Sequence, residues 1–219
     1  MIDDDISLPA DTLAILNQFL AEKAQREQEE LDKIEQKAGK EAEFEEDWQL
    51  SQFWYSAGTK KSMGSAVSQL LEEVQDKSSY SIALLSSPSL YATVKEIHEN
   101  VKIFEFDKRF SAYGDDFVFY DFNEGDNENY LKELWHKFDV IIADPPFLSE
   151  ECITKISKII KNLLKPQGKI IFCSGEIVEP WLTACLPVNK CKFQPEHERN
   201  LGNEFVSYAN FNLDDFIKC

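Results

Sequence analysis

Short apolar runs separated by stretches of helical pattern constrain the fold of this chain more than any other feature. From residue 81 onward the runs have the length of buried strands, and helix-forming residues fill the stretches between them. Strands that alternate with helices build βαβ units, so we expect an α/β domain with a mainly parallel sheet. The last two strands have no long helix between them, which predicts an antiparallel end. The predicted strands are 81–85, 101–106, 117–119, 138–143, 169–173, 191–193 and 204–211, and the predicted helices are 60–74, 89–98, 127–137, 149–164 and 176–186.

An acidic extension precedes this domain. Residues 1–47 contain 15 Asp or Glu and 5 Lys or Arg, which together account for −10 of the net charge of −17. Residues 8–38 have a helical pattern whose apolar stripe fades into charged residues, and residues 40–47 are an acidic linker. We therefore expect a helical and partly disordered N-terminal extension over residues 1–47 and a folded domain over residues 48–219.

The composition argues against several classes of protein. A net charge of −17 repels phosphate backbones, so direct nucleic-acid binding is not expected, whereas a basic protein partner would be attracted. The five cysteines are widely spaced and the three histidines lack metal-ligand spacing, so we predict reduced thiols and no metal. The acidic start does not resemble a secretory signal, and no apolar run reaches the roughly 18 residues of a membrane span. These features predict a cytosolic or nuclear protein.

The sequence Asp144-Pro145-Pro146-Phe147 follows the apolar run 138–143 and is the strongest candidate for a reactive site. Each proline fixes its own φ and holds the preceding residue in an extended conformation, so the carboxylate and the aromatic ring are kept at a set separation. Acceptors beside a flat apolar wall suit the positioning of an amino nitrogen. The four residues resemble the [DNS]-P-P-[YFW] motif of methyltransferases that transfer a methyl group from S-adenosyl-L-methionine to amino or amide nitrogens. The alternative is a plain Pro-Pro turn before a helix capped by Ser149.

Three strand ends offer contacts to such a cofactor, because ligands of open α/β sheets bind beyond the carboxyl ends of the strands. Ser86 and Ser87 follow the first strand, where a glycine-rich turn is usual, and would contribute backbone N–H groups and hydroxyls. Asp107 follows the second strand and is the predicted acceptor of the ribose hydroxyls, with Glu105 as the substitute if the register differs. Asp121 follows the third strand and is predicted either to accept the adenine amino group or to form an Asx turn.

The segment 48–56 contains four aromatic residues among nine. We expect it to pack over the end of the sheet as a lid, with Gln52 and Ser56 reaching the cofactor. A plain core segment is the alternative, and a nucleic-acid stacking platform is disfavoured because no basic residues interleave with the aromatic ones.

Several segments together resemble one family, the eukaryotic elongation factor 1-alpha lysine methyltransferases, once labelled N6-adenine DNA methyltransferases. The resemblance covers roughly residues 44–211 and implies a Rossmann-like seven-stranded methyltransferase sheet. It also implies a cytoplasmic enzyme that uses S-adenosyl-L-methionine to methylate a lysine of translation elongation factor 1-alpha, a basic protein substrate. We expect the enzyme to be a monomer. The matching segments are Asp47–Ser56, Phe104–Phe110, Phe119–Asp121, Ala143–Cys152 and Asn203–Phe205, with Ser87-Pro88-Ser89 and Tyr91 similar to the family's first loop.

Two other functions stay open at the level of sequence. An N6-adenine methyltransferase of nucleic acids would use the same Asp144 acceptors and stack a flipped base on Phe147. The net negative charge of the chain argues against this function. A non-catalytic acidic adaptor would keep the fold and lose the cofactor, as the first loop without glycine allows. In the lysine reaction Asp144 and the Pro145 carbonyl would aim the nitrogen, although a carboxylate also favours the unreactive ammonium form.

Overall fold

The computed structural model describes residues 12, 18, 21, 25, 44, 46, 47, 50, 52–199 and 205–217. The chain divides into two compact units, Met1–Ala42 and Glu43–Cys219. The four described residues of the first unit are helical and exposed, and the rest of the predicted helix 8–38 lies outside the described residues, as do Trp48 and most of the linker.

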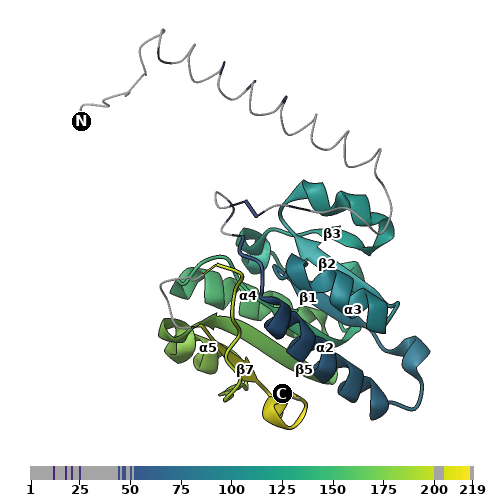
Figure 1. The fold of residues 1–219 in the computed structure, drawn as a ribbon. Coiled ribbons are helices and arrows are strands. Elements are labelled where there is room, and N and C mark those ends of the chain that lie inside the picture. Colours follow the sequence, from purple (N-terminus) through teal and green to yellow (C-terminus); the bar gives the residue numbers. More distant parts are fainter. Residues whose placement is uncertain are drawn as a thin grey trace. The chain divides into compact units, whose positions relative to one another are not determined.

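A seven-stranded sheet with the order β3-β2-β1-β4-β5-β7-β6 organises the second unit (Figure 1). Every pairing from β3 to β5 is parallel, while β7 runs antiparallel to both β5 and β6. The predicted fold class, a mainly parallel sheet with an antiparallel end, is confirmed. The strands are β1 (Ile82–Leu85), β2 (Val101–Glu105), β3 (Phe117–Phe119), β4 (Phe138–Ala143), β5 (Leu164–Gly175), β6 (Asn189–Lys190) and β7 (Phe205–Ala209).

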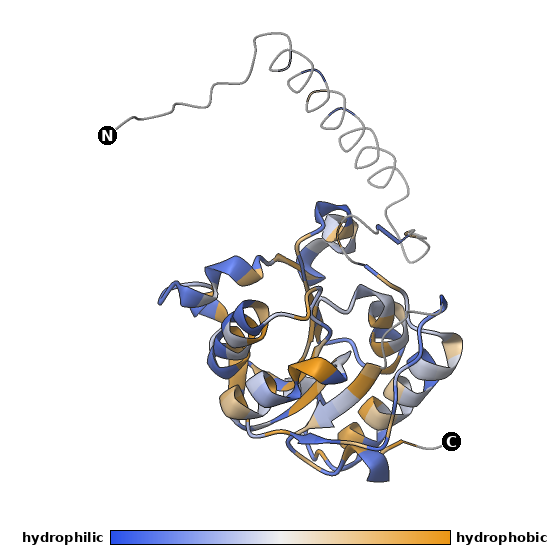
Figure 2. Ribbon diagram, turned by 90° about the vertical axis from the view of Figure 1, so that its left-hand side faces the viewer, coloured by the Kyte–Doolittle hydropathy of each residue, from blue (hydrophilic) through white to orange (hydrophobic). Residues whose placement is uncertain are grey.

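Helices cover both faces of the sheet, which therefore has an apolar core on each side. One core packs α2 and α3 against Ile82 and Leu84 of β1, and the other packs α4 and α5 against Ala83 and Leu85 of the same strand. Successive strand residues point to opposite faces, so the unbroken apolar run of β1 is explained by burial on both sides. Hydrophobic colour lies along the strands in Figure 2, and the outer helices mix both colours. The helices are α2 (Ala57–Glu72), α3 (Tyr91–Ile97), α4 (Glu150–Leu163) and α5 (Glu179–Cys185), joined by 3₁₀ turns at 77–79, 88–90, 108–116, 122–126, 132–134, 176–178 and 213–215.

Capping side chains set the beginnings of two helices. Ser149 accepts a hydrogen bond from the Cys152 N–H at 3.3 Å, as predicted for the helix that follows the Pro-Pro segment. Ser56 accepts from the Thr59 N–H at 3.2 Å, so α2 begins three residues before its predicted start at Lys60.

The helix predicted over 127–137 is wrong. The described chain has only a 3₁₀ turn at Lys132–Leu134 there, and Leu131 and His136 adopt left-handed backbone angles. The Asn127 side chain accepts from the Asn129 N–H, a local bond that competes with helical hydrogen bonding. The predicted strand 191–193 is also displaced, to Asn189–Lys190, because the Asp214 carboxylate takes the N–H groups of residues 192 and 193.

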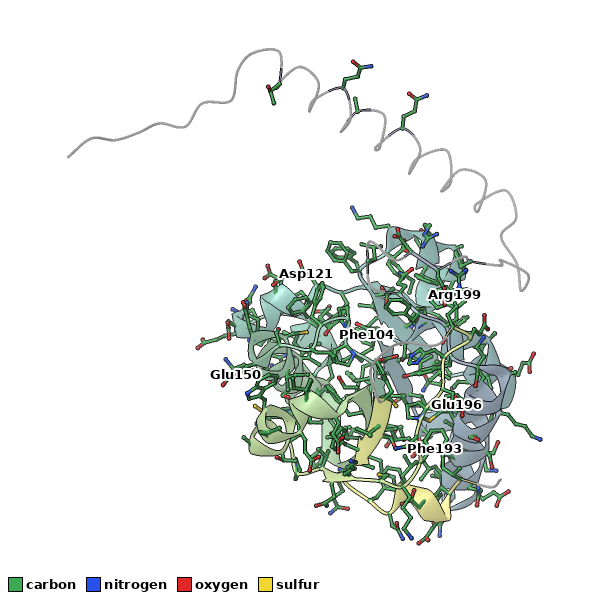
Figure 3. All side chains as sticks on the ribbon, turned by 60° about the vertical axis from the view of Figure 1, so that its left-hand side comes forward. Phe104, Asp121, Glu150, Phe193, Glu196 and Arg199 are labelled. Atoms are coloured by element: carbon green, nitrogen blue, oxygen red, sulfur yellow. The ribbon has the colours of Figure 1, made fainter. Side chains whose placement is uncertain are left out.

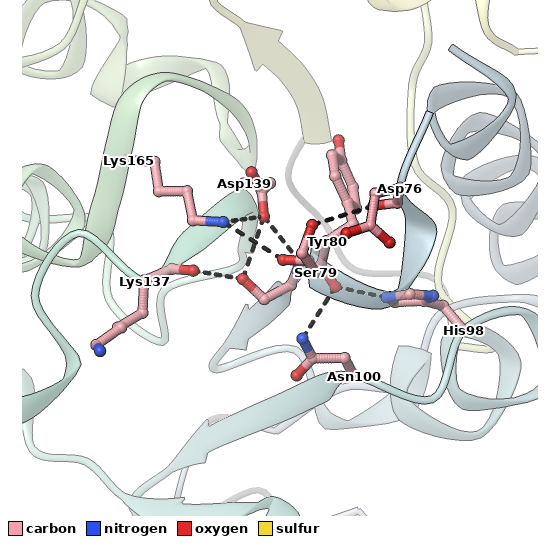
Figure 4. Close-up of polar contacts among 9 residues, drawn as sticks. Asp76, Ser79, Tyr80, His98, Asn100, Lys137, Asp139 and Lys165 are labelled. Carbon is pink, nitrogen blue, oxygen red and sulfur yellow. Dashed lines mark hydrogen bonds and ion pairs between the residues drawn. The ribbon is translucent and has the colours of Figure 1, made fainter. Parts of the chain in front are cut away.

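A polar cluster holds the sheet together at the amino ends of its strands (Figure 4). Asp139 accepts from the Ser81 N–H at 2.8 Å and from the Lys165 ammonium at 2.6 Å, while the Ser81 hydroxyl donates to the Lys137 carbonyl. Just before β2, Asn100 donates to the Tyr80 carbonyl at 3.0 Å. These contacts lie at the edge opposite to the carboxyl ends of the parallel strands, so they serve stability.

Candidate functional site

A cavity of about 460 Å³ opens at the carboxyl ends of β1 to β4. Strand β1 is flanked by β2 on one side and β4 on the other, so this edge contains the switch point at which open α/β sheets bind ligands. The cavity is large enough for a nucleoside-sized ligand and a side chain beside it. Its lining consists of Leu50, Gln52, Phe53, Trp54, Ser86, Ser87, Pro88, Ser89, Glu105, Phe106, Tyr120, Asp121, Phe122, Asn123, Asp144, Pro145, Pro146, Phe147, Leu148, His197 and Phe205.

All four residues of the Pro-Pro segment line this cavity. The Asp144 N–H donates to the Leu85 carbonyl at 3.0 Å, which continues the pairing of β4 with β1 by one residue and fixes where the carboxylate leaves the sheet. Burial raises the pKa of Asp144 to about 7. Phe147 remains 46% exposed and meets the Phe122 ring edge-on at 5.7 Å. The segment thus places a half-buried carboxyl group beside an open aromatic wall.

The loop after β1 replaces glycine with serine. Ser86 has a φ of +50°, a left-handed conformation that glycine adopts freely and other residues adopt at a cost. Its N–H donates to the Phe104 carbonyl at 3.0 Å, and the buried Ser87 hydroxyl donates to the Ile142 carbonyl at 3.2 Å. The loop is therefore tied to both strands that flank β1. Ser86 therefore makes the sharp turn for which a glycine is usual at this position.

Two carboxylates follow one another at the end of β2, and only one faces the cavity. Glu105 lines it, and its Oε2 atom is buried without a hydrogen-bond partner among the described residues. Asp107 is absent from the lining and instead accepts from Arg109 Nε at 2.8 Å and from Gln52 Nε2 at 3.0 Å. The structure therefore does not bring Asp107, the residue predicted to bind ribose, to the cavity wall. Glu105, the predicted substitute, is there.

The environment of Glu105 disfavours its charge. Burial raises its pKa to about 7, and the nearby Asp107 carboxylate adds to the shift. A long contact of 3.5 Å from Gln52 Nε2 to its Oε1 atom and hydrogen bonds from the backbone of Asp107 and Phe106 oppose this shift in part. A buried carboxylate with an unused acceptor is costly, unless a ligand with donors completes its hydrogen bonding.

Asp121 forms the Asx turn predicted as one of its two alternatives, and it also lines the cavity. Its Oδ1 atom accepts from the Asn123 N–H and side-chain amide, each at 2.9 Å, which is an Asx turn. The residue also lines the cavity together with Asn123. Its Oδ2 atom is thus not needed for these bonds and is available to a donor in the cavity.

The aromatic segment reaches the cavity through residues 52–54. Gln52 is buried and links Glu105 to Asp107, whereas Ser56 caps α2 and does not line the cavity. Tyr55 is fully buried and does not line the cavity, and its backbone pairs with that of His197. Of the two residues predicted to reach the cofactor, therefore, only Gln52 lies at the cavity wall.

Sequence reasoning missed two residues from the far end of the chain. His197 and Phe205 line the cavity, and their rings meet at 4.6 Å. Figure 3 shows Phe193, Glu196 and Arg199 along the segment that leads there. This segment is held at α2, because the Glu196 carbonyl accepts from the Ser56 N–H at 2.8 Å. The match of Phe205 to the family segment Asn203–Phe205 was the one signal available, and residues 203 and 204 lie outside the described part.

Comparison with known proteins decides the family. A profile of the family described as "Probable N6-adenine methyltransferase" matches residues 46–213. The chain belongs to this methyltransferase family. The Drosophila melanogaster member named Protein-lysine N-methyltransferase CG9154 is 63% identical over 221 residues, which cover 99% of each chain.

Vertebrate members of the family are also similar over almost their whole length. EEF1A lysine methyltransferase 1 of Mus musculus is 43% identical and the match covers 99% of this chain and 97% of that one. The Homo sapiens protein of the same name is 42% identical, with 99% and 96% covered. The family predicted from the sequence segments is confirmed. Within the described residues, no helix is long and apolar enough to cross a membrane, and no cluster of ligands suits a metal ion.

Proposed function

We propose that this family member is an S-adenosyl-L-methionine-dependent protein-lysine N-methyltransferase that acts on a lysine of translation elongation factor 1-alpha. The observation that carries the proposal is the Asp144–Phe147 segment at the wall of the cavity, in a chain whose full-length relatives are named lysine methyltransferases. The acidic balance of the chain suits a basic substrate protein. We further propose that the enzyme works as a cytoplasmic monomer without binding nucleic acid directly.

The unpaired Glu105 oxygen supports a cofactor with a ribose. A carboxylate at the end of the second strand accepts two vicinal hydroxyls, as in dinucleotide-binding folds, and Glu105 has the free acceptor that this requires. Asp121 and Asn123 at the end of β3 offer polar groups for an adenine base, and Phe106 and Phe122 offer rings against which it packs. The Ser86–Ser89 loop supplies backbone N–H groups and hydroxyls. Bound here, S-adenosyl-L-methionine supplies an electrophilic methyl group and leaves as a neutral thioether.

Asp144 and its neighbours then position the nucleophile. The carboxylate and the Pro145 carbonyl accept N–H bonds from the lysine and direct its lone pair along the cavity. Phe147 and Phe122 form an aromatic wall that stabilises the cationic charge developing on the nitrogen. Trp54, His197 and Phe205 complete the cavity lining and help to exclude water.

The proton of the lysine ammonium has a defined acceptor. A carboxylate with a pKa of about 7 takes up a proton more readily than one with an ordinary pKa, and burial of the lysine lowers the pKa of its ammonium from about 10.4. Both effects reduce the difference between the pKa of the Asp144 carboxyl group and that of the lysine ammonium. We propose that an Asp144 oxygen receives the proton before the nitrogen attacks, and releases it to solvent after transfer.

Methyl transfer from labelled S-adenosyl-L-methionine tests the function. The full chain is incubated with purified elongation factor 1-alpha, with total RNA and with duplex DNA in separate reactions. We expect label in the protein only, at lysine, resistant to nuclease. Label in DNA or RNA alone would establish the N6-adenine reaction instead.

Two matched variants locate the reaction. Asp144→Asn keeps the shape of the side chain and removes its charge, so transfer should fall by at least about 100-fold. Asp139→Asn changes a carboxylate at the opposite end of β4 and should leave the rate per folded molecule unchanged. If the cofactor neither binds nor reacts with the unaltered chain, the adaptor function stands.

A further inference from the structure

The segment 193–199 contributes to the cavity wall although it contains no helix or regular strand. One end of it is held at β7, because the Ser207 hydroxyl donates to the Phe193 carbonyl at 2.5 Å. Its other end lies against residues 54–60, far earlier in the chain, where Tyr55 and His197 form an isolated antiparallel bridge. A stretch with so little regular structure has a fixed position only where individual groups hold it.

The buried side chain of Thr59 holds this segment at the start of α2. Thr59 is 3% exposed and lies in the first turn of the helix. Its hydroxyl oxygen accepts from the Glu196 N–H at 2.7 Å, and the hydroxyl donates to the Glu196 carbonyl at 2.9 Å. The same carbonyl also accepts from the Ser56 N–H at 2.8 Å. Both backbone groups of Glu196 are therefore satisfied by the beginning of α2.

His197 stands between two anchored residues. On its carboxyl side the Glu198 N–H donates to the Trp54 carbonyl at 2.8 Å, so the backbone is bound both before and after the histidine. The imidazole ring lies 5.0 Å from the Tyr55 ring and 4.6 Å from the Phe205 ring, and it lines the cavity with Phe205. The position of these two rings in the wall thus depends on the anchors beside the histidine.

The two rings lie at the opposite end of the cavity from the groups proposed to bind the nucleoside. Glu105 ends β2 and Asp121 follows β3, whereas Phe205 pairs with Gly175 at the carboxyl end of β5. Asp144 follows β4, which lies between β1 and β5 in the sheet, so it stands between the two ends. A cofactor bound over β1 and β2 therefore leaves the space between Asp144 and the two rings to the substrate lysine.

The geometry points to Thr59 as a positioning residue that fixes the His197–Phe205 wall at the substrate end of the cavity. This inference rests on the proposed lysine reaction. The two rings pack against the methylene chain of the lysine, while its nitrogen faces Asp144. Thr59 does not line the cavity, so it acts on the substrate only through the segment that it holds.

Thr59→Val removes the hydroxyl and keeps the shape of the side chain. We expect the KM for elongation factor 1-alpha to rise about tenfold, because the wall that contacts the lysine is no longer fixed. The kcat should change by less than about threefold and the Kd for S-adenosyl-L-methionine by less than about twofold, since neither Asp144 nor Glu105 depends on this contact. Thr59→Ser retains the hydroxyl and should restore the KM to within about twofold of the unaltered chain.

Lys60→Met is the matched control. It removes the exposed ion pair between Lys60 and Glu198, at 2.9 Å, which joins the same two segments. Exposed pairs contribute little, so KM and kcat should both stay within about twofold. If Thr59→Val lowered only the apparent kcat at an unaltered KM, the variant would merely contain less folded enzyme, and the inference would be wrong. Equal changes in KM for Thr59→Val and Thr59→Ser would also overturn it.

Hydrogen exchange without substrate separates this inference from the proposed function. The Glu198 N–H keeps its Trp54 acceptor in every variant, so its exchange rate reports the motion of the segment. By NMR, we expect exchange at least about tenfold faster in Thr59→Val, at the unaltered rate in Thr59→Ser and Lys60→Met, and with no change at Leu84 of the core strand β1. This pattern supports the inference even if elongation factor 1-alpha is not methylated. An unaltered rate at Glu198, or an equal acceleration at Leu84, contradicts it even if methylation proceeds.

Discussion

Replacing Glu105 by glutamine tests the cofactor site directly. A ribose diol that donates to both oxygens of an ionised Glu105 makes two charge-assisted hydrogen bonds, each worth about 1.5–3 kcal/mol. Glutamine keeps one acceptor, turns the other into a donor and removes the charge. We expect a loss of about 2–3 kcal/mol, or roughly a 30- to 150-fold higher Kd for S-adenosyl-L-methionine at pH 8 by calorimetry.

The same substitution should stabilise the fold. The folded pKa of Glu105 is about 7 against an ordinary 4.5, so its contribution to stability is complete below pH 4.5 and is lost as the pH rises through 7. The difference of about 2.5 units corresponds to at most about 3 kcal/mol at pH 8, which glutamine recovers because it does not titrate. Urea unfolding of both proteins at pH 5 and pH 8 measures this, and the advantage of Glu105→Gln should grow with pH.

Asp107→Asn is the comparison variant, because Asp107 has the same charge and lies two residues further along. Its carboxylate does not line the cavity and is taken up by Arg109 and Gln52, so we expect cofactor binding to weaken by less than about fivefold. The assignment of the ribose to Glu105 would be refuted by the reverse order, with Asp107→Asn losing binding and Glu105→Gln retaining it.

Three further predictions concern the turn, the wall and the far edge of the sheet. Ser86→Gly should change the free energy of unfolding by less than about 1 kcal/mol, whereas Ser86→Val should destabilise by about 1–3 kcal/mol in urea, because a β-branched residue resists a φ of +50°. Phe147→Ala should lower kcat by about 5- to 30-fold in the methyl-transfer assay with little loss of stability, since the exposed ring acts through cation–π contact. Asp139→Ala should cost about 2–3 kcal/mol because the Ser81 N–H loses its acceptor, and Lys165→Met less than about 1 kcal/mol; equal losses in urea would contradict this account.

The strands and most helices could be predicted because their signals are local. Strand β1 is an unbroken apolar run, β4 is interrupted only by Asp139, and Ser149 stands directly before its helix, so apolar pattern and capping identify them. The segment 127–137 failed for the opposite reason. Its apolar side chains, among them Tyr130 and Trp135, pack onto the core from successive turns, and a helical pattern does not distinguish that arrangement from a helix.

The same distinction between local signals and long-range packing applies to the site. The sequence by itself determined that Asp144 and Phe147 belong to a rigid unit at a strand end, because proline geometry acts within a few residues, and that the chain suits a basic partner, because charge adds up without regard to fold. Only the tertiary structure decided that Glu105 faces the cavity, since this depends on the register of β2 beside β1 and on the capture of Asp107 by Arg109. It also decided that His197 and Phe205 line the cavity beside Asp144, because that wall joins segments far apart in the chain, which come together only when the sheet has formed.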